Sequence, residues 1–345
     1  MTGVFISWTR QNGRTADLAL ALGLTPEYVY LESALGLPGR YARQLRATRT
    51  LLRRTAPARA VLMLPPAPAL FSFVGARRHR PKRLVFDLHT GFFLDPKWAW
   101  SARPALRLMR RLGGTAIVTG DALRRECERA GVPAVVLHDA IGEAEPPREH
   151  SGFLLCPLSY ANDEPVAEIL AAAALTPDIE WRLTGRAPES VVAAAPPNVT
   201  FTGFVSDVEY SELVRTSLAV VALTTRARTM QRAGYEAFSA GVPHITSDFP
   251  ELREFYAESG VFAVPAAHAI VAAVRDLTER RAELVAALAR VRAIRIGEQR
   301  RGLDAVRAAL GLAARFEGRN GAGHGHGLGH GLDRPAHDQP MSGDA

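Results

Sequence analysis

The stretch Thr229–Asp248 reads TMQRAGYEAFSAGVPHITSD and passes from a helical pattern, through a Gly-Val-Pro turn, into a short β-like run. Pro243 prevents the helix from continuing beyond the turn. Residues 242–247 are typical of a short buried strand. One carboxylate, Glu236, lies in the middle of the most packable face of this helix. A helix that turns directly into a buried strand predicts an α/β unit, so the same alternation is expected on both sides.

The flanking sequence does alternate short apolar runs with helical patterns. In the second half, strands are expected at 152–158, 179–185, 198–203, 218–225 and 242–247, and helical segments at 164–176 and 267–316. In the first half, strands are expected at 3–8, 27–32, 60–64, 83–89, 115–120 and 134–139, and helices at 14–23, 38–54 and 121–131, the last of them capped by Asp121. Such alternation indicates parallel βαβ units.

This pattern predicts an α/β fold of two tandem Rossmann-like, doubly wound domains with a cleft between them and C-terminal helices. The N-terminal domain is expected at residues 1–145 and the C-terminal domain at residues 146–315. Residues 316–345 are Gly-rich and His-rich with little to bury, which predicts a disordered tail. His324, His326 and His330 could hold a transition metal weakly, although a solvated tail without function explains them as well.

The charge balance favours anionic partners. The 345 residues include 42 Lys and Arg against 35 Asp and Glu, a formal net charge of +7. This excess suits nucleotides, phosphate esters, acidic lipid headgroups or nucleic acid, without choosing among them. Two cysteines, no secretory signal at the N-terminus and a longest uncharged run (60–76) broken by prolines indicate the cytoplasm.

The start of the helix around Glu236 is a candidate phosphate site. Thr229 is expected to cap a helix that begins at Met230 and continues through Gln231, whose exposed amides favour an anion. Three arginines lie at the same end, at positions 226, 228 and 232. A diphosphate held there would leave a ribose near Glu236, and a carboxylate is the usual acceptor for two vicinal hydroxyls. The alternative is a surface helix whose Glu236 pairs with Arg232 at i−4.

Four motifs in the second half resemble the nucleotide-sugar-binding domain of GT-B glycosyltransferases, most closely the retaining family 4. They are WRLTG (181–185), PNVTFTGFV (197–205), LAVVALTT (218–225) and YEAFSAGVP (235–243), within a resemblance that covers about residues 150–265. The resemblance implies that Glu236 is the second Glu of the Glu-x7-Glu motif, which holds the donor's ribose. It also implies that Arg186, which follows the TG pair, is a candidate for binding the donor phosphates, although an exposed loop arginine explains it as well.

One position departs from the family pattern. The first Glu of the motif would fall at residue 228, which is Arg228 in this chain. In the family that Glu helps to place the donor sugar, so its absence leaves the identity of the sugar undetermined. It also leaves open the alternative that this is a catalytically silent binding or scaffold protein. An arginine could instead serve the diphosphate.

The first half offers a candidate catalytic pair. The stretches VLMLPPAPA (61–69) and LVFDLHTGFF (84–93) are similar to those of lipid-linked-sugar mannosyltransferases of the GT-B fold. His89 would lie at the carboxyl end of a strand, where it can donate to a sugar hydroxyl or act as a base, and Asp87 could orient it. Gly13 lies in the loop after the first strand, as glycines do in these enzymes, although a tight turn also explains it. A core histidine is the alternative for His89.

Two basic helices with apolar residues suit an anionic membrane surface. Residues 40–54 carry six arginines around Tyr41, Leu45 and Leu52, and residues 97–114 carry Trp98, Trp100 and Met109. Arginines beside aromatic residues favour a membrane interface, where a lipid-linked acceptor would be met. Ordinary solvated helix faces are the alternative. No nucleic-acid-binding motif is evident, so nucleic acid is not expected as a partner.

These observations predict a glycosyltransferase that moves a sugar from a nucleotide-diphosphate donor to an acceptor hydroxyl in cell-surface glycan, polysaccharide or glycolipid synthesis. Retention follows from the resemblance alone, and the Asp-x-His stretch keeps inversion open. No Asp-x-Asp occurs, so no metal cofactor is expected. Besides the silent protein, a nucleotide-sugar epimerase of the same fold stays open. A dinucleotide dehydrogenase is disfavoured because no G-x-G-x-x-G follows the first strand.

Overall fold

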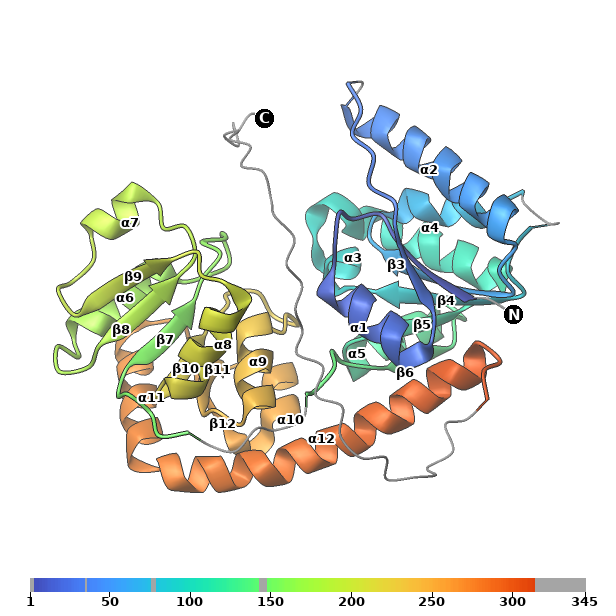
Figure 1. Ribbon diagram of the computed structural model, residues 1–345. Helices are drawn as coiled ribbons and strands as arrows, with labels where there is room; N and C mark the ends of the chain where they lie inside the picture. The colour runs from blue at the N-terminus through green and yellow to red at the C-terminus, as the bar shows by residue number, and fades with distance from the viewer. Residues whose placement is uncertain (1–2, 35, 76–78, 143–147, 314–345) are drawn as a thin grey trace. The chain divides into compact units, whose positions relative to one another are not determined.

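A computed structural model describes residues 3–34, 36–75, 79–142 and 148–313 (Figure 1). The first half forms a six-stranded sheet in the order β2-β1-β3-β4-β5-β6, in which every pairing is parallel. Its strands are β1 Gly3–Ser7, β2 Thr25–Tyr28, β3 Arg59–Leu64, β4 Arg83–Leu88, β5 Thr115–Val118 and β6 Ala134–Val136. This order reverses direction beside β1, as in a doubly wound domain.

The second half forms another fully parallel sheet of six strands, in the order β12-β11-β10-β7-β8-β9. Its strands are β7 Leu154–Pro157, β8 Trp181–Thr184, β9 Val199–Gly203, β10 Ala219–Ala222, β11 His244–Ser247 and β12 Gly260–Ala263. The two sheets confirm the predicted pair of Rossmann-like domains. Strand β12 was not predicted from the sequence.

Helices connect the strands in both halves. The first half contains α1 Gly13–Leu22, α2 Gly36–Thr55, the 3-10 helix η1 Ala67–Phe73, α3 Thr90–Leu94, α4 Pro96–Leu112 and α5 Asp121–Arg129. The second half contains α6 Val166–Ala174, α7 Glu189–Ala193, α8 Asp207–Thr216, α9 Arg232–Ala240, α10 Pro250–Tyr256, the 3-10 helix η2 Ala257–Ser259, α11 Ala267–Glu279 and α12 Arg281–Ala309.

The strands of the first sheet bury both faces, because consecutive side chains point to opposite sides. Ile6 belongs to a core on one face that includes Met109 of α4, and Phe5 belongs to a core on the other face with Leu18 of α1. The second core also contains Val306, which comes from the last turns of α12. The long helix α12 therefore completes the first sheet's core, and each fully buried Val or Leu in it contributes about 1.5–3 kcal/mol.

Several details differ from the predictions. Asp121 is the first residue of α5 rather than its cap, because Gly120 occupies the N-cap position and the Asp121 side chain accepts from Arg124 instead. Strand β2 ends at Tyr28, short of the predicted segment 27–32. The C-terminal helical segment is two helices, α11 and α12, and the second runs unbroken for 29 residues.

The predicted boundary at residues 145–146 and the predicted tail at 316–345 lie outside the described residues, so both stay predictions. None of the helices in the described part of the chain is long and apolar enough to cross a membrane. The uncharged run at 60–76 instead supplies β3 and η1, and places Leu64 and Phe73 in the core. Cys127 and Cys156 are both buried as free thiols.

Candidate functional site

Helix α9 begins at Arg232, two residues later than predicted. Its N-cap is Gln231, and no side chain caps the helix. The Gln231 side chain instead donates to the carbonyl of Leu223 at the end of β10, at 3.0 Å, and so ties the loop to the sheet. Thr229 is therefore not the cap. Its buried hydroxyl has no hydrogen-bond partner within the described residues.

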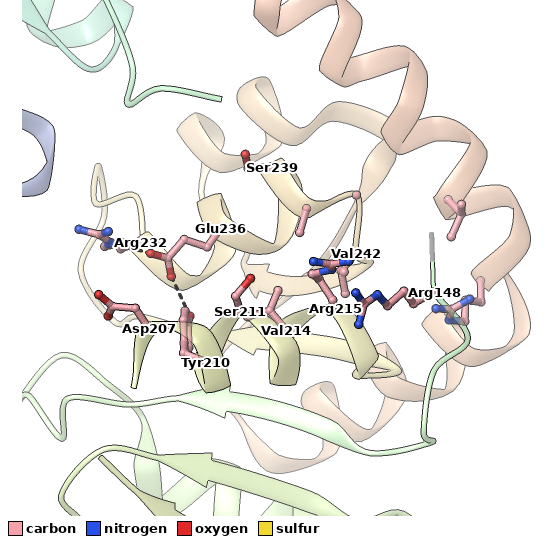
Figure 2. A pocket seen from close by; sticks show the side chains of 14 residues that line it. Arg148, Asp207, Tyr210, Ser211, Val214, Arg215, Arg232, Glu236, Ser239 and Val242 are labelled. Atoms are coloured by element: carbon pink, nitrogen blue, oxygen red, sulfur yellow. Dashed lines mark hydrogen bonds and ion pairs between the residues drawn. The ribbon is translucent and has the colours of Figure 1, made fainter. Parts of the chain in front are cut away.

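Glu236 lies one turn into α9 and is held by two neighbours (Figure 2). The Glu236 carboxylate accepts from the Tyr210 hydroxyl of α8 at 2.7 Å and from Arg232 Nε at 2.6 Å. The i−4 pairing named above as the alternative is thus present in the structure. The carboxylate is still 32% exposed, so a ligand can reach it. Burial, followed by the nearby Glu236 charge, raises the pKa of Tyr210 well above its usual range, so Tyr210 remains a donor.

A cavity of about 500 Å³ lies between α8 and α9 and contains Glu236 in its wall. Its volume falls within the range of small-molecule sites, roughly 300–1,000 Å³. Tyr210 and Arg232 line the same end as Glu236. Sequence reasoning missed Tyr210, since only the tertiary fold brings α8 against α9.

Gly13 and Arg232 approach each other closely. A Cβ atom at Gly13 would lie 2.9 Å from Arg232 Nη1, so a side chain there would displace the guanidinium. Gly13 is also the first residue of α1, and the Asn12 side chain caps this helix by accepting from the Thr15 amide. The structure therefore brings the loop after β1 close to Arg232 at the start of α9.

Arg228 does not join Arg232. It adopts a left-handed backbone conformation, with φ +58°, and its Nε lies 3.8 Å from Glu251 of α10. With Met230 it lines a second cavity, of about 600 Å³, and neither residue is among those that line the cavity of Glu236. The three predicted arginines therefore do not cluster. Arg232 and Arg228 line different cavities, and Arg226 lines neither and lies 3.8 Å from Asp163.

Arg186 lies exposed in the loop after β8. The preceding Gly185 has φ +87°, and a Cβ atom there would lie 2.1 Å from the carbonyl oxygen of Leu158. Only glycine fits this close approach of two backbones, which explains the Gly of the TG pair.

Asp87 is fully buried at the end of β4 and is bound by an arginine that the sequence analysis did not single out. Arg14 donates from Nε to both Asp87 oxygens at 3.1 Å, and from Nη2 to Oδ1 at 2.9 Å. The same guanidinium donates from Nη1 to Asp139 Oδ1 at 2.6 Å and from Nη2 to the carbonyl of Leu137 at 2.8 Å. The sequence signal that could have identified Arg14 was its position directly after Gly13, at the start of a predicted helix.

His89 lies beside this buried pair. Its Nε2 lies 3.5 Å from Asp87 Oδ2, and the ring is 31% exposed at the carboxyl edge of the first sheet. Burial opposes ionisation of Asp87, but the charge of Arg14 and the His89 contact outweigh it and hold the pKa of Asp87 well below its usual range. A carboxylate that stays ionised can orient the ring.

No group of three His, Cys, Asp or Glu side chains within the described ranges is arranged to hold a metal ion. The histidines at 324, 326 and 330 lie outside those ranges.

Residues 164–280 match the protein family described as glycosyl transferases group 1. This segment contains Arg186, residues 228–232 and Glu236, so all of the predicted donor-binding residues except Gly13 fall within it. A search of curated proteins finds no match to this sequence.

Solved structures with the same fold include glycosyltransferases. Anabaena Alr3699/HepE in complex with UDP and glucose has a TM-score of 0.66 at 14% identity, over 89% of this chain and 99% of that one. The apo lipopolysaccharide outer core galactosyltransferase WaaB has a TM-score of 0.63 at 13% identity, over 89% and 100%. A putative UDP-N-acetylglucosamine 2-epimerase from Listeria monocytogenes has a TM-score of 0.60 at 12% identity, over 84% and 91%. These likenesses show the GT-B fold.

Proposed function

We propose that this chain, which has the GT-B fold, is a glycosyltransferase that moves a sugar from a nucleotide-diphosphate donor to an acceptor hydroxyl during the synthesis of a cell-surface glycan, polysaccharide or glycolipid. The group 1 glycosyl transferase match at residues 164–280 supports a nucleotide-sugar donor in the second half. The first half then holds the acceptor. HepE, which shares the fold, has been solved with UDP-glucose.

The observation that carries this proposal is the arrangement of Glu236, Tyr210 and Arg232 on α8 and α9. Tyr210 fixes one oxygen of Glu236, and Arg232 binds the other. When a ribose arrives, its two hydroxyls can donate to the same carboxylate, and Arg232 can turn to the diphosphate without leaving its charge unpaired. Arg232 is the exposed partner of the pair, at 73% against 32% for Glu236, so it can move.

The diphosphate is assigned to the space between Gly13 and the residues at the start of α9. The small Gly13 leaves room beside Arg232, and the uncapped amides of α9 favour negative charge. We assign Thr229, Met230 and Gln231 to this site through the backbone that leads into the helix. Arg186 and Arg228 are assigned to the phosphates as well; both would have to turn toward them from their present positions.

Catalysis is assigned to positioning and to stabilisation of the leaving diphosphate by arginines and helix amides, with no metal cofactor in the scheme. His89 contributes a donor or base at the sugar, and Asp87, held ionised by Arg14, orients it. Retention of the anomeric configuration is proposed rather than inversion. Among the described residues, His89 is nevertheless a candidate base of the kind inversion requires.

An acceptor at a membrane is supported by the surface of the first half. Trp100 of α4 is 76% exposed, and α4 carries four arginines after it in the sequence. Phe71 of η1 is 51% exposed, and Arg49 of α2 donates to its carbonyl at 3.0 Å. Leu52 and Met109 of the same helices face the core instead. We propose a cytoplasmic protein that binds peripherally to the anionic inner face of the membrane, with no role for nucleic acid.

A second candidate function is a GT-B protein that binds its ligand without transfer. The contact between Arg228 and Glu251 favours it, because Arg228 occupies the position of the motif's first Glu and lies outside the cavity of Glu236. Retained nucleotide binding with no sugar transfer would support this candidate.

The test is a thermal-shift screen of UDP, GDP, ADP and TDP and their sugars. Glu236→Ala is compared with the wild type and with Glu279→Ala, a control at the exposed end of α11. A ligand that binds the native state raises the melting temperature. We expect one nucleotide to stabilise the wild type and the control but not Glu236→Ala. Equal stabilisation of all three would refute the assigned role of Glu236.

A further inference from the structure

The second cavity, of about 600 Å³, is the one that Arg228 and Met230 line. Its walls come from the carboxyl ends of β5 and β6 and from α5, α9, α10 and α12. Its volume falls within the range of small-molecule sites, roughly 300–1,000 Å³, and doubly wound sheets bind their ligands at the carboxyl ends of the strands. This cavity is therefore a candidate site in its own right.

Three polar atoms of its lining residues are buried without a hydrogen-bond partner within the described part of the chain. They are the Tyr235 hydroxyl, Nδ1 of His138 and Oε2 of Glu251. Tyr235 as a whole is only 5% exposed. Buried polar atoms in folded proteins nearly always have a partner, because leaving one unsatisfied costs stability. Together these atoms point to a ligand whose groups both accept and donate hydrogen bonds.

The charged groups around this cavity balance each other. The arginines that line it are Arg125, Arg228, Arg295 and Arg301, and the carboxylates are Asp121, Glu251, Glu254 and Glu298. Arg295 Nη1 donates to Glu298 Oε2 at 2.6 Å. His138 adds no charge near neutral pH, because burial and then the charges of Arg14 and Arg295 lower its pKa to about 4. An anionic ligand meets no surplus of positive charge here, so the cavity favours an uncharged ligand.

The cavity lies next to both parts of the proposed reaction centre. On one wall, Thr119 Oγ1 lies 3.4 Å from Oγ1 of Thr90, the residue that follows His89. On another wall, Tyr235 directly precedes Glu236 on α9. Consecutive side chains leave a helix about 100° apart, so Tyr235 lines this cavity while Glu236 lines the other. A ligand bound here is thus close to the proposed base and to the proposed donor.

We propose that this cavity binds the acceptor, and that the part of the acceptor it holds is an uncharged sugar ring. Sugar hydroxyls both donate and accept, so one ring can satisfy the Tyr235 hydroxyl, the His138 nitrogen and the Glu251 oxygen together. Phe255 packs against the rings of Tyr235 and His138, with centroids 5.1 Å and 4.6 Å away, and so fixes two of these groups in place. The inference rests on the proposed sugar transfer and adds the class and the position of the acceptor.

The test titrates methyl glycosides of glucose, galactose, mannose and N-acetylglucosamine, and follows binding by ligand-observed NMR. Tyr235→Phe removes only the hydroxyl. Tyr256→Phe is the matched control, because its hydroxyl is also buried without a partner among the described residues and belongs to the same core cluster, but Tyr256 is not among the residues that line the cavity. We expect at least one methyl glycoside to bind the wild type and Tyr256→Phe equally, and Tyr235→Phe about 2- to 13-fold more weakly. Binding of none of them, or equal binding by all three proteins, would overturn the proposal.

Nucleotide affinity, measured on the same three proteins, separates this proposal from the proposed function. We expect it to be the same in all three, while Tyr235→Phe raises the KM for the methyl glycoside in the transfer assay. If a nucleotide binds and no methyl glycoside does, the donor proposal stands and the acceptor cavity is refuted. If a methyl glycoside binds and no nucleotide does, the sugar cavity stands and the proposed transfer is refuted.

Two further ligands test the class and the position of the sugar. Glucose 6-phosphate should bind no more tightly than methyl glucoside; tighter binding would show that the cavity prefers an anion and would refute an uncharged acceptor. A nucleotide sugar should bind Tyr235→Phe as tightly as it binds the wild type. A loss for the nucleotide sugar but not for the bare nucleotide would show that the cavity holds the donor's sugar, and the acceptor assignment would fail.

Discussion

Arg232 and Glu236 lie one helical turn apart on α9, and Arg232 Nε donates to Glu236 Oε1 at 2.6 Å. The same Arg232 reaches to within 2.9 Å of the place that a Cβ atom of Gly13 would occupy. One exposed arginine thus lies between the carboxylate proposed for the ribose and the glycine loop proposed for the diphosphate. The ion pair neutralises two of the charged groups that are proposed for the donor site.

Replacing Tyr210 with Phe should weaken nucleotide binding. The substitution removes the hydroxyl that fixes Glu236 at 2.7 Å, a bond worth about 0.5–1.5 kcal/mol, which corresponds to a loss in affinity of about 2- to 13-fold. Calorimetric titration with the nucleotide found in the screen measures it. Tyr30→Phe is the control, because the Tyr30 hydroxyl accepts from Arg40 in the first half. Unchanged affinity in Tyr210→Phe would show that Tyr210 does not prepare the carboxylate.

Replacing His89 with Gln should lower kcat while leaving donor binding intact. A positioned acid or base contributes about 10²- to 10⁴-fold to rate, and His89 is the imidazole next to the ionised Asp87. The rate of donor turnover and the nucleotide Kd are measured on the same preparation. His79→Gln, at an exposed position, should match the wild type. A kcat for His89→Gln within a factor of two of the wild type would remove His89 from the mechanism.

His244 should make the protein less stable in mild acid. It is fully buried between Phe238 and Tyr256, and burial lowers its pKa to about 4. The unfolded chain takes up the proton near pH 6.5, so stability from neutral His244 is fully present above that pH and is lost as the pH falls toward 4. Across this pH window the free energy of unfolding falls by about 3 kcal/mol.

Urea unfolding of the wild type and His244→Leu at several pH values between these limits measures this contribution. The difference in unfolding free energy between the two proteins should change with pH in favour of the variant as the pH falls. A constant difference would mean that His244 does not resist protonation in the folded state.

Replacing Gly185 with Ala should destabilise the second half more than the same change at Gly152. Both glycines have positive φ, +87° and +83°, which is strained for alanine by about 1 kcal/mol or more. At Gly185 the new Cβ would also meet the carbonyl of Leu158 at 2.1 Å, whereas nothing lies within 4 Å at Gly152. Thermal unfolding of the two variants, side by side, tests this. An equal decrease in melting temperature for the two variants would show that the backbones of Gly185 and Leu158 can move apart at no cost.

Much of the fold followed from local sequence patterns. The apolar runs at 60–64 and 83–89 became β3 and β4 within one residue, because strands of a parallel sheet that is covered on both faces are nearly continuous apolar runs. The helix 14–23 ended where Gly23 takes the left-handed conformation, as predicted. Strand β12 was not predicted because it has only four residues, one of them a glycine, which is too short a segment to show a strand periodicity.

The start of α9 was misplaced for a physical reason. Thr229 has the residue type that caps helices, but the Gln231 side chain bonds to Leu223 on β10 instead, and this contact sets where the helix begins. The arginine that binds Asp87 could likewise not be predicted from the sequence. Arg14 and Asp87 are 73 residues apart in sequence. The two meet only because the sheet places β1, which leads into the helix of Arg14, two strands from the β4 strand of Asp87.

The sequence by itself determined the α/β alternation, the paired sheets, the group 1 segment and the individual residue types of the donor motif, because periodicity and turn residues act locally. Only the tertiary structure decided which charges meet. It paired Glu236 with Tyr210, joined Arg14 to Asp87, separated Arg228 from Arg232 and brought Tyr235 and His138 to one cavity. Electrostatic contacts depend on distance in space, and in a fold built from crossover connections that distance is set by packing rather than by separation along the chain.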